Sequence, residues 1–154
     1  MALVVILGWY FVIGVLAAIG TVTITKSQFS PRVEHVFFAV LLIPVAGMYL
    51  VFTRYFGDAS VLRPELYAVA VFVVLALLGL RLPAFLILGY ALHGAWDLVH
   101  EVSVHLASAP GGARRVSDIP LAYGVFCAAY DWYVAGYFVT GRRAARCQSQ
   151  PDSS

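Results

Sequence analysis

Long apolar segments separated by short polar breaks constrain this chain more than any other feature. Residues 2–20 carry no charged side chain, and a helix needs about 20 mostly apolar residues to cross a bilayer. Four further apolar segments follow, each bounded by charged residues, proline or glycine. A backbone in lipid must satisfy its hydrogen bonds internally, so such segments fold as helices. The sequence therefore predicts an all-α integral membrane protein.

The expected architecture is a five-transmembrane-helix bundle in a single transmembrane domain, residues 1–141. The spans are expected at about residues 2–20, 33–56, 65–81, 84–104 and 118–140. The first segment lacks the basic region of a signal peptide, so we expect it to be retained as a span. The tail at residues 142–154 is basic and then polar, and we expect it to be disordered.

The composition excludes several classes of protein. The chain is 62% hydrophobic and 12% charged, whereas soluble domains are about 45–50% apolar and about 25% charged. A soluble enzyme and a disordered chain are therefore excluded. A net charge of +2 with scattered basic residues excludes a nucleic-acid module. Cys127 lies in an apolar segment and Cys147 in the basic tail, so we expect no disulfide between them.

We expect the chain to lie in the cell membrane and to cross it several times. Its expected partner is the lipid bilayer. Five spans place the two termini on opposite sides. The side of the C-terminus then carries Lys26, Arg32, Arg81, Arg142, Arg143 and Arg146, and the other side carries Arg54, Arg63, Arg114 and Arg115. Because basic residues favour the cytoplasmic side, this slight excess favours an outside N-terminus.

A polar stripe on the fourth expected span points to function. Side chains three and four residues apart share one face of a helix. The stripe consists of His93, Trp96, Asp97, His100 and Glu101. An ionisable group at mid-membrane costs about 2.5–3.5 kcal/mol on insertion scales, and such groups are functional-site candidates by default. We therefore expect the stripe to face the bundle interior.

Asp131 on the fifth span is the expected partner of this stripe. At 1.5 Å per residue, His93 and Asp131 both lie roughly 15–18 Å from the outer face, and Asp97 lies roughly 10 Å from it. We therefore expect His93 and Asp131 to meet, with Asp97 and His100 lining a cavity above them. A purely structural His93–Asp131 pair is the alternative.

Four ionisable groups near the ends of the spans allow two interpretations. Glu101 approaches the outer interface, as does His100, and a charged side chain there reaches water at little cost. Glu34 and His35 begin the second span near the inner face. They either close the lower end of the cavity or lie in the headgroup region.

Proton-initiated isomerisation or cyclisation of a lipid-soluble polyene is one chemistry that suits these residues. It needs a carboxylic acid kept neutral by burial and aromatic faces that stabilise cations. Trp96 and Tyr130 each lie next to an acid on an expected inward face, and Tyr90 adds an aromatic ring on the fourth span. A metal-dependent enzyme that uses His93, Asp97 and His100 is the rival, since two histidines and one carboxylate suit Zn or non-haem Fe.

A non-enzymatic membrane protein is a further alternative, and a transporter is disfavoured. An odd number of spans without an internal repeat fits inverted-repeat transporters poorly. The chain has no Asp-rich DDxxD segment and no P-loop, which disfavours ionisation of a pyrophosphate.

Two resemblances arise at these residues. His93–His100, with Cys127–Asp131 and Gly141, resembles a family of small bacterial membrane proteins of unknown function, which implies five spans and no stated activity. Ala95-Trp96-Asp97 is similar to the Ala-Trp-Glu step of membrane-bound terpene cyclases of meroterpenoid, indole-diterpene (paspaline) and drimentine pathways. That resemblance implies that Asp97 is the initiating acid and Asp131 the second acid.

The function predicted from the sequence is a proton-initiated cyclase or isomerase of an isoprenoid or prenylated substrate. Asp97 is the expected general acid, tuned by His93 or His100, and Asp131 is the second acid or final proton acceptor. The residues expected to contact substrate are Tyr90, Trp96, Glu101 and Tyr130. No cofactor is expected.

Overall fold

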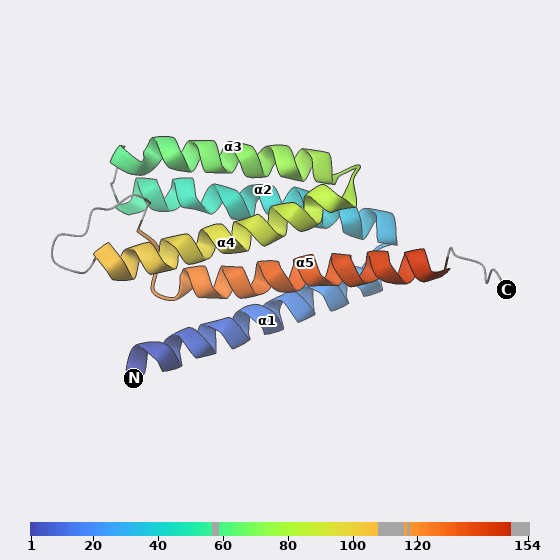
Figure 1. Ribbon diagram of the computed structural model, residues 1–154, viewed down its shortest axis with the longest axis horizontal. Coiled ribbons are helices and arrows are strands. Elements are labelled where there is room, and N and C mark those ends of the chain that lie inside the picture. Colours follow the sequence, from blue (N-terminus) through green and yellow to red (C-terminus); the bar gives the residue numbers. More distant parts are fainter. Residues whose placement is uncertain (57–58, 108–115, 117, 149–154) are drawn as a thin grey trace.

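The computed structural model describes residues 1–56, 59–107, 116 and 118–148, with the side chains of residues 59, 106–107 and 142–148 left undescribed (Figure 1). The elements are α1 (Ala2–Gln28), α2 (Pro31–Phe56), the short 3-10 helix η1 (Ala59–Val61), α3 (Leu62–Gly79), α4 (Pro83–Ala107) and α5 (Tyr123–Gln148). Every regular element in the described part of the chain is helical, so the predicted all-α class is confirmed.

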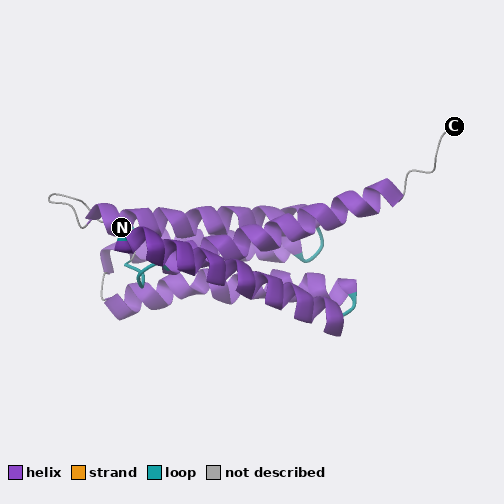
Figure 2. Cartoon of the chain, turned by 90° about the horizontal axis from the view of Figure 1, so that it is seen from below, coloured by secondary structure: helices purple, strands orange, loops and turns teal. Residues whose placement is uncertain are grey.

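The five long helices lie roughly side by side along the long axis of the molecule (Figures 1 and 2). α4 packs on α5 on one side and on α3 on the other, while α2 packs on α3 and α4. α1 packs on α5 and crosses the other helices obliquely (Figures 1 and 2). This order places the polar stripe of α4 between α2, α3 and α5.

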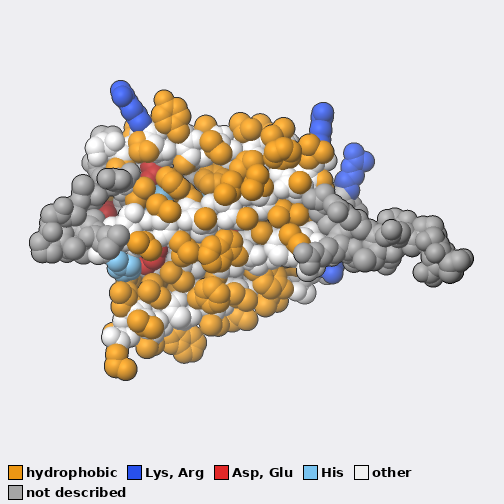
Figure 3. Space-filling model, in the orientation of Figure 1, with side chains coloured by type: hydrophobic (Ala, Val, Ile, Leu, Met, Phe, Trp, Pro, Cys, Tyr) orange, Lys and Arg blue, Asp and Glu red, His pale blue; other side chains and the backbone are white. Residues whose placement is uncertain are grey.

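Within the described residues, three helices, α1, α2 and α3, are long and apolar enough to cross a membrane by length and composition. α4 and α5 are equally long, but ionisable residues interrupt their apolar sequences. Hydrophobic side chains cover most of the visible face, and Lys and Arg project toward the two ends of the helices (Figure 3).

The helix bounds differ from the expected spans at two places. α1 continues through the polar stretch after Gly20 and ends at Gln28. The hydroxyls of Thr21 and Thr25 donate to backbone oxygens one turn earlier, at 2.9 Å each, so these side chains need no loop. α5 begins at Tyr123 and continues to Gln148, into the expected tail. Residues 149–154 of that tail lie outside the described residues.

A glycine allows α4 and α5 to approach closely. A Cβ atom added to Gly124 would lie 2.4 Å from the carbonyl oxygen of Asp97 and 2.9 Å from the Cβ of Glu101. Any side chain here would push the two helices apart, because real Cβ atoms do not approach other atoms this closely. Gly124 therefore helps to bring Asp131 of α5 within reach of the stripe on α4.

Candidate functional site

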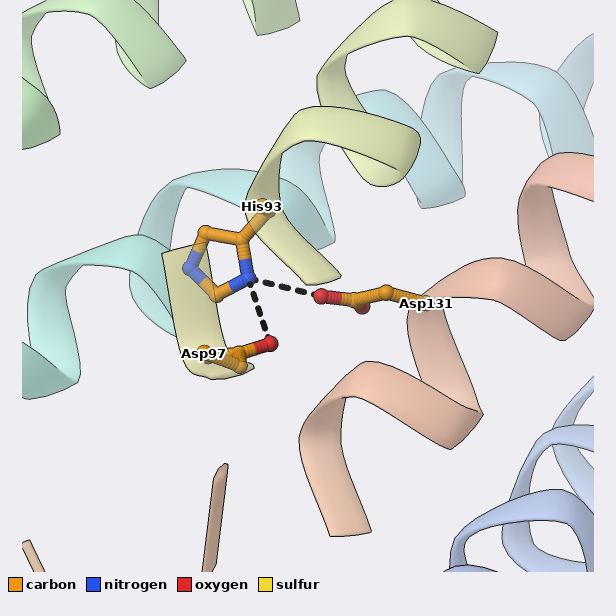
Figure 4. A group of neighbouring side chains, drawn as sticks. All are labelled: His93, Asp97 and Asp131. Carbon is orange, nitrogen blue, oxygen red and sulfur yellow. Dashed lines mark hydrogen bonds and ion pairs between the residues drawn. The ribbon is translucent and has the colours of Figure 1, made fainter. Parts of the chain in front are cut away.

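His93, Asp97 and Asp131 form a buried group that we call the central cluster (Figure 4). His93 Nδ1 lies 2.6 Å from Asp131 Oδ2 and 3.3 Å from Asp97 Oδ2. Each of the three side chains is at most 1% exposed. The expected contact between His93 and Asp131 is confirmed. The cluster also contains Asp97, one turn further along α4.

Tyr49 of α2 completes the surroundings of Asp97. Its hydroxyl donates a hydrogen bond to Asp97 Oδ1, and its side chain is 1% exposed. Asp97 therefore faces Tyr49 with one oxygen and His93 with the other. This environment is dry, as expected, but it is built from protein groups and not from an open cavity above Asp97.

His100 belongs to a second buried pair. Its Nε2 lies 2.8 Å from Glu65 Oε1, and both side chains are fully buried. Its Nδ1 lies 3.0 Å from the carbonyl oxygen of Trp96, which accepts only, so Nδ1 carries the proton. The ring of His100 also stacks on Tyr49, with centroids 4.0 Å apart. His100 thus lies behind Tyr49 and outside the central cluster.

Three atoms of the central cluster have no hydrogen-bond partner within the described part of the chain. They are His93 Nε2, Asp97 Oδ2 and Asp131 Oδ1, and all are buried. Buried polar atoms are rarely left unsatisfied, so each such atom calls for an explanation. Asp97 Oδ2 still has an ion pair with His93, and the Asp131 oxygen is the most informative of the three because of the space beside this residue.

Asp131 forms part of the wall of an apolar cavity of about 190 Å³ between α1, α2 and α5. The other lining residues are Ala17, Leu41, Val45, Met48, Tyr123, Phe126, Cys127 and Tyr130. Three of them carry aromatic rings. The cavity is thus an apolar, aromatic space with one carboxyl group at its edge.

The structure places the residues that were expected to contact substrate in different parts of the fold. Tyr130 lines the cavity beside Asp131. Tyr90 is fully buried in the core and donates to the backbone oxygen of Phe38 at 2.8 Å. Trp96 lines a different hollow, against α3.

Glu101 connects α4 to α5. Its Oε2 accepts the backbone N–H of Gly124 at 3.1 Å, and its Oε1 lies 3.0 Å from His105 Nε2. It is 5% exposed. This carboxylate therefore has partners for both oxygens, and it does not line the cavity beside Asp131.

A second buried group, which we call the terminal cluster, lies near the α1–α2 connection. The carboxylate of Glu34 accepts from the hydroxyl of Tyr137 at 3.0 Å, and it shares the hydroxyl proton of Thr25, 3.3 Å away, with the backbone oxygen of Thr21. His35 Nε2 lies 2.6 Å from the backbone oxygen of Gly79 and connects α2 to the end of α3. Glu34 is 6% exposed, so protein groups enclose its carboxylate.

Sequence reasoning did not identify Tyr49, Glu65, Tyr123 or Phe126 as parts of the site. Tyr49 lies seven residues before the end of α2, roughly 10 Å from the helix end and thus at the depth of Asp97. The depth comparison applied to Asp131 would therefore have found it. Glu65 gave no such signal, because a carboxylate in the first turn of a helix is usual at a surface.

The comparisons with known proteins give a family and no activity. A protein-family model described as "Family of unknown function (DUF6010)" matches residues 9–144. The chain belongs to this family. The matched range contains every residue of the central cluster, which agrees with the predicted resemblance to a family of unknown function. No curated protein and no solved structure matches the chain.

The central cluster offers three ligand atoms within 4.8 Å of one another, which is the basis of a possible metal site. It differs from the expected set because Asp131 takes the place of His100. Two ligands about 2.1 Å from one tetrahedral ion lie about 3.4 Å apart. His93 Nδ1 and Asp131 Oδ2 are 2.6 Å apart, which is a hydrogen-bond distance. The pair would have to open by almost 1 Å to hold an ion, so the observed geometry favours a shared proton.

Proposed function

We propose that this chain is a five-span membrane enzyme that exchanges protons with an unsaturated, lipid-soluble substrate. The observation that carries the proposal is the position of Asp131. This carboxyl group belongs to a buried cluster of ionisable residues, and it also borders an apolar cavity with three aromatic rings. The reaction class is isomerisation or cyclisation of an isoprenoid, started by a proton.

The five-span architecture is supported by the outer surface of α4. The ionisable side chains of α4 at positions 93, 97, 100 and 101 are all buried. Its exposed large side chains are apolar: Leu88, Leu92, Val99 and Val102. Their apolar surfaces suit lipid, although the polar stripe lowers the mean hydropathy of α4. Five crossings make this a multi-pass protein of the cell membrane.

Charge balance explains how the central cluster holds a transferable proton. Two carboxylates and a neutral imidazole would bury two negative charges, which is strongly unfavourable in an apolar interior. Two protons make the cluster neutral: one creates an imidazolium at His93, and the other stays on a carboxyl group. The second proton is the one available for chemistry.

The structure supports a different division of roles from the one predicted from the sequence. Asp131 borders the cavity and has an oxygen without a hydrogen-bond partner among the described residues. We therefore assign proton donation to Asp131. Asp97, held by Tyr49 and His93, is the reservoir: His93 Nδ1 passes its proton to Asp131 and takes one from Asp97. After Asp131 has protonated the substrate, its carboxylate accepts the proton that the carbocation loses, so the cluster ends with the two protons it began with. Tyr123, Phe126 and Tyr130 supply ring faces that stabilise a carbocation.

The similarity of Ala95-Trp96-Asp97 to membrane-bound terpene cyclases remains part of this proposal. Its basis is those three residues. It agrees with a proton-initiated reaction, but it assigns initiation to Asp97, whereas we assign it to Asp131 because Asp131 borders the cavity.

Deuterium incorporation tests the proposal. The purified protein in lipid nanodiscs would be incubated in D₂O with geranylgeraniol, farnesol or a farnesylated indole. We expect a rearranged product that carries carbon-bound deuterium, formed about 10²–10⁴-fold more slowly by Asp131→Asn. Unchanged formation of product by Asp131→Asn would refute its role as donor, and the same result for Asp97→Asn would refute its role as reservoir.

A metal-dependent membrane enzyme is the second candidate, and the grouping of His93, Asp97 and Asp131 favours it. One divalent cation would neutralise two carboxylates as well as two protons do. Elemental analysis of the purified protein separates the two candidates. A stoichiometric metal that is lost in His93→Ala would replace the proton-transfer account.

A further inference from the structure

The cavity beside Asp131 adjoins a second apolar hollow along α2. This hollow has a volume of about 370 Å³ and is lined by Phe29, Val33, Val36, Phe37, Val40, Leu41 and Pro44. Leu41 lines both hollows. Together they follow α2 from its first turns to Met48, which is roughly 22 Å along a helix axis. We call the two hollows together the α2 track.

The side of the track between α1 and α2 is open because α1 is attached mainly to α5. A Cβ added to Gly14 would lie 2.3 Å from the carbonyl oxygen of Phe126, so the two backbones are in direct contact. α1 crosses α2 obliquely (Figures 1 and 2) and contributes Ala17 as its one residue in the wall of the cavity. The small side chain of Ala17 leaves the cavity accessible from the bilayer.

The two ends of the α2 track differ. Beyond Met48 and Tyr123, a hydrophobic cluster of Tyr49, Phe52 and Ile119 packs against these two residues and closes the track. The other end begins at Phe29 and Val33, beside the exposed Lys26 and Arg32. The track therefore has a closed end near the carboxyl group of Asp131 and an open end at a charged surface.

We infer that the substrate is a linear amphiphile with an unsaturated apolar chain, which enters from the bilayer between α1 and α2. The far end of its chain occupies the cavity at Asp131, and its polar head lies at the level of Phe29. A cavity of about 190 Å³ is smaller than the roughly 300–1,000 Å³ of pockets that enclose a drug-sized ligand. It therefore holds a chain end and not a whole lipid. This inference rests on the proposed function.

Photochemical cross-linking tests the orientation of the chain. Two geranylgeraniol probes would be used with the native protein in nanodiscs, one with a diazirine at the end of the chain and one with a diazirine beside the hydroxyl. We expect the first probe to label the cavity residues, among them Met48 and Phe126, and the second to label residues 29–40. Reversed labelling, or labelling spread over the exposed faces of α3, would overturn the inference.

Two variants sharpen this test. Ala17→Trp fills the entrance, and we expect about tenfold weaker labelling of the cavity at a fixed probe concentration. Val74→Trp places the same side chain on an exposed position of α3 and serves as the matched control. Equal labelling in the two variants would contradict entry between α1 and α2. If Ala17→Trp does not fold, the labelling pattern of the native protein still decides the question.

Asp131→Asn separates the inference from the proposed function. This variant keeps the shape of the cavity, so we expect it to be labelled like the native protein. Native labelling together with an unchanged reaction rate would refute the proposed proton donor and leave the binding mode intact. If the probe does not label the cavity of the native protein, the binding mode is refuted and the proposed proton donor is not affected.

Discussion

The central and terminal clusters are both buried and polar, yet they are built differently. In the terminal cluster, one carboxylate accepts from two hydroxyl groups. In the central cluster, two carboxyl groups share one imidazole, and atoms of His93, Asp97 and Asp131 lack hydrogen-bond partners within the described residues. Only the central cluster borders the cavity between α1, α2 and α5. The difference shows how a buried polar group that joins helices can be distinguished from one equipped for proton transfer.

The largest expected effect is on catalysis, from removal of the carboxyl group of Asp131. Asp131→Asn should lower the rate of product formation about 10²–10⁴-fold, because an amide cannot replace the donated proton. Glu34→Gln is the matched control in the terminal cluster and should retain the native rate. Equal rates for the two variants would remove the distinction between the clusters.

The next largest effect is on stability, from a side chain added where α4 and α5 approach each other. Gly124→Ala should destabilise the fold by about 1–3 kcal/mol, because its methyl group overlaps the backbone of Asp97. The matched control is Gly136→Ala, since a Cβ at Gly136 meets nothing within 4 Å. That variant should stabilise the helix by roughly 0.5–1 kcal/mol. Thermal unfolding in detergent measures both, and equal stabilities would show that the contact at Gly124 is not tight.

Removal of the Tyr49 hydroxyl, which contacts the central cluster, should lower the stability of the fold by a similar amount. Tyr49→Phe leaves Asp97 Oδ1 without its donor, and an unsatisfied buried acceptor costs about 1–3 kcal/mol. We expect lower stability and a slower reaction. Tyr55→Phe, at a position that is 80% exposed, is the control and should change neither. A native-like Tyr49→Phe would show that Asp97 does not depend on this hydrogen bond.

The smallest effect is expected in the terminal cluster. Tyr137→Phe removes one of two hydroxyl donors to Glu34, and the loss of such a hydrogen bond costs about 0.5–1.5 kcal/mol. The rate of product formation should stay native, since Tyr137 does not line the cavity. A rate reduced as much as in Asp131→Asn would give the terminal cluster a catalytic role.

The central cluster was largely predictable because helix geometry fixes depth. Spacing along α4 placed His93 and Asp97 on one face, and depth along antiparallel helices placed Asp131 opposite His93. The same arithmetic applies to Tyr49. What the sequence did not specify is the lateral order of the helices, since apolar surfaces are interchangeable in lipid. The pairing of His100 with Glu65 of α3 depends on that order, and so does the cavity beneath α1.

The helix bounds were less predictable than the central cluster. Thr21 and Thr25 suggested a loop, yet their hydroxyls bond to the preceding helical turn and the helix continues. Ser and Thr favour either outcome, because the same hydroxyl can bond within a helix or outside it. Hydropathy alone also does not identify α4 as a membrane-spanning helix, because its buried polar stripe lowers its mean hydropathy.

Infrared spectroscopy of the purified protein at neutral pH tests the central claim without knowledge of the substrate. A neutral central cluster contains one protonated carboxyl group, which has a distinct carbonyl stretch. The account predicts that subtracting the spectrum of Asp131→Asn or of Asp97→Asn from the native spectrum reveals this band, because either variant leaves one carboxylate paired with the imidazolium. Two ionised carboxylates in the native protein, seen as no such band in either difference spectrum, would contradict the account.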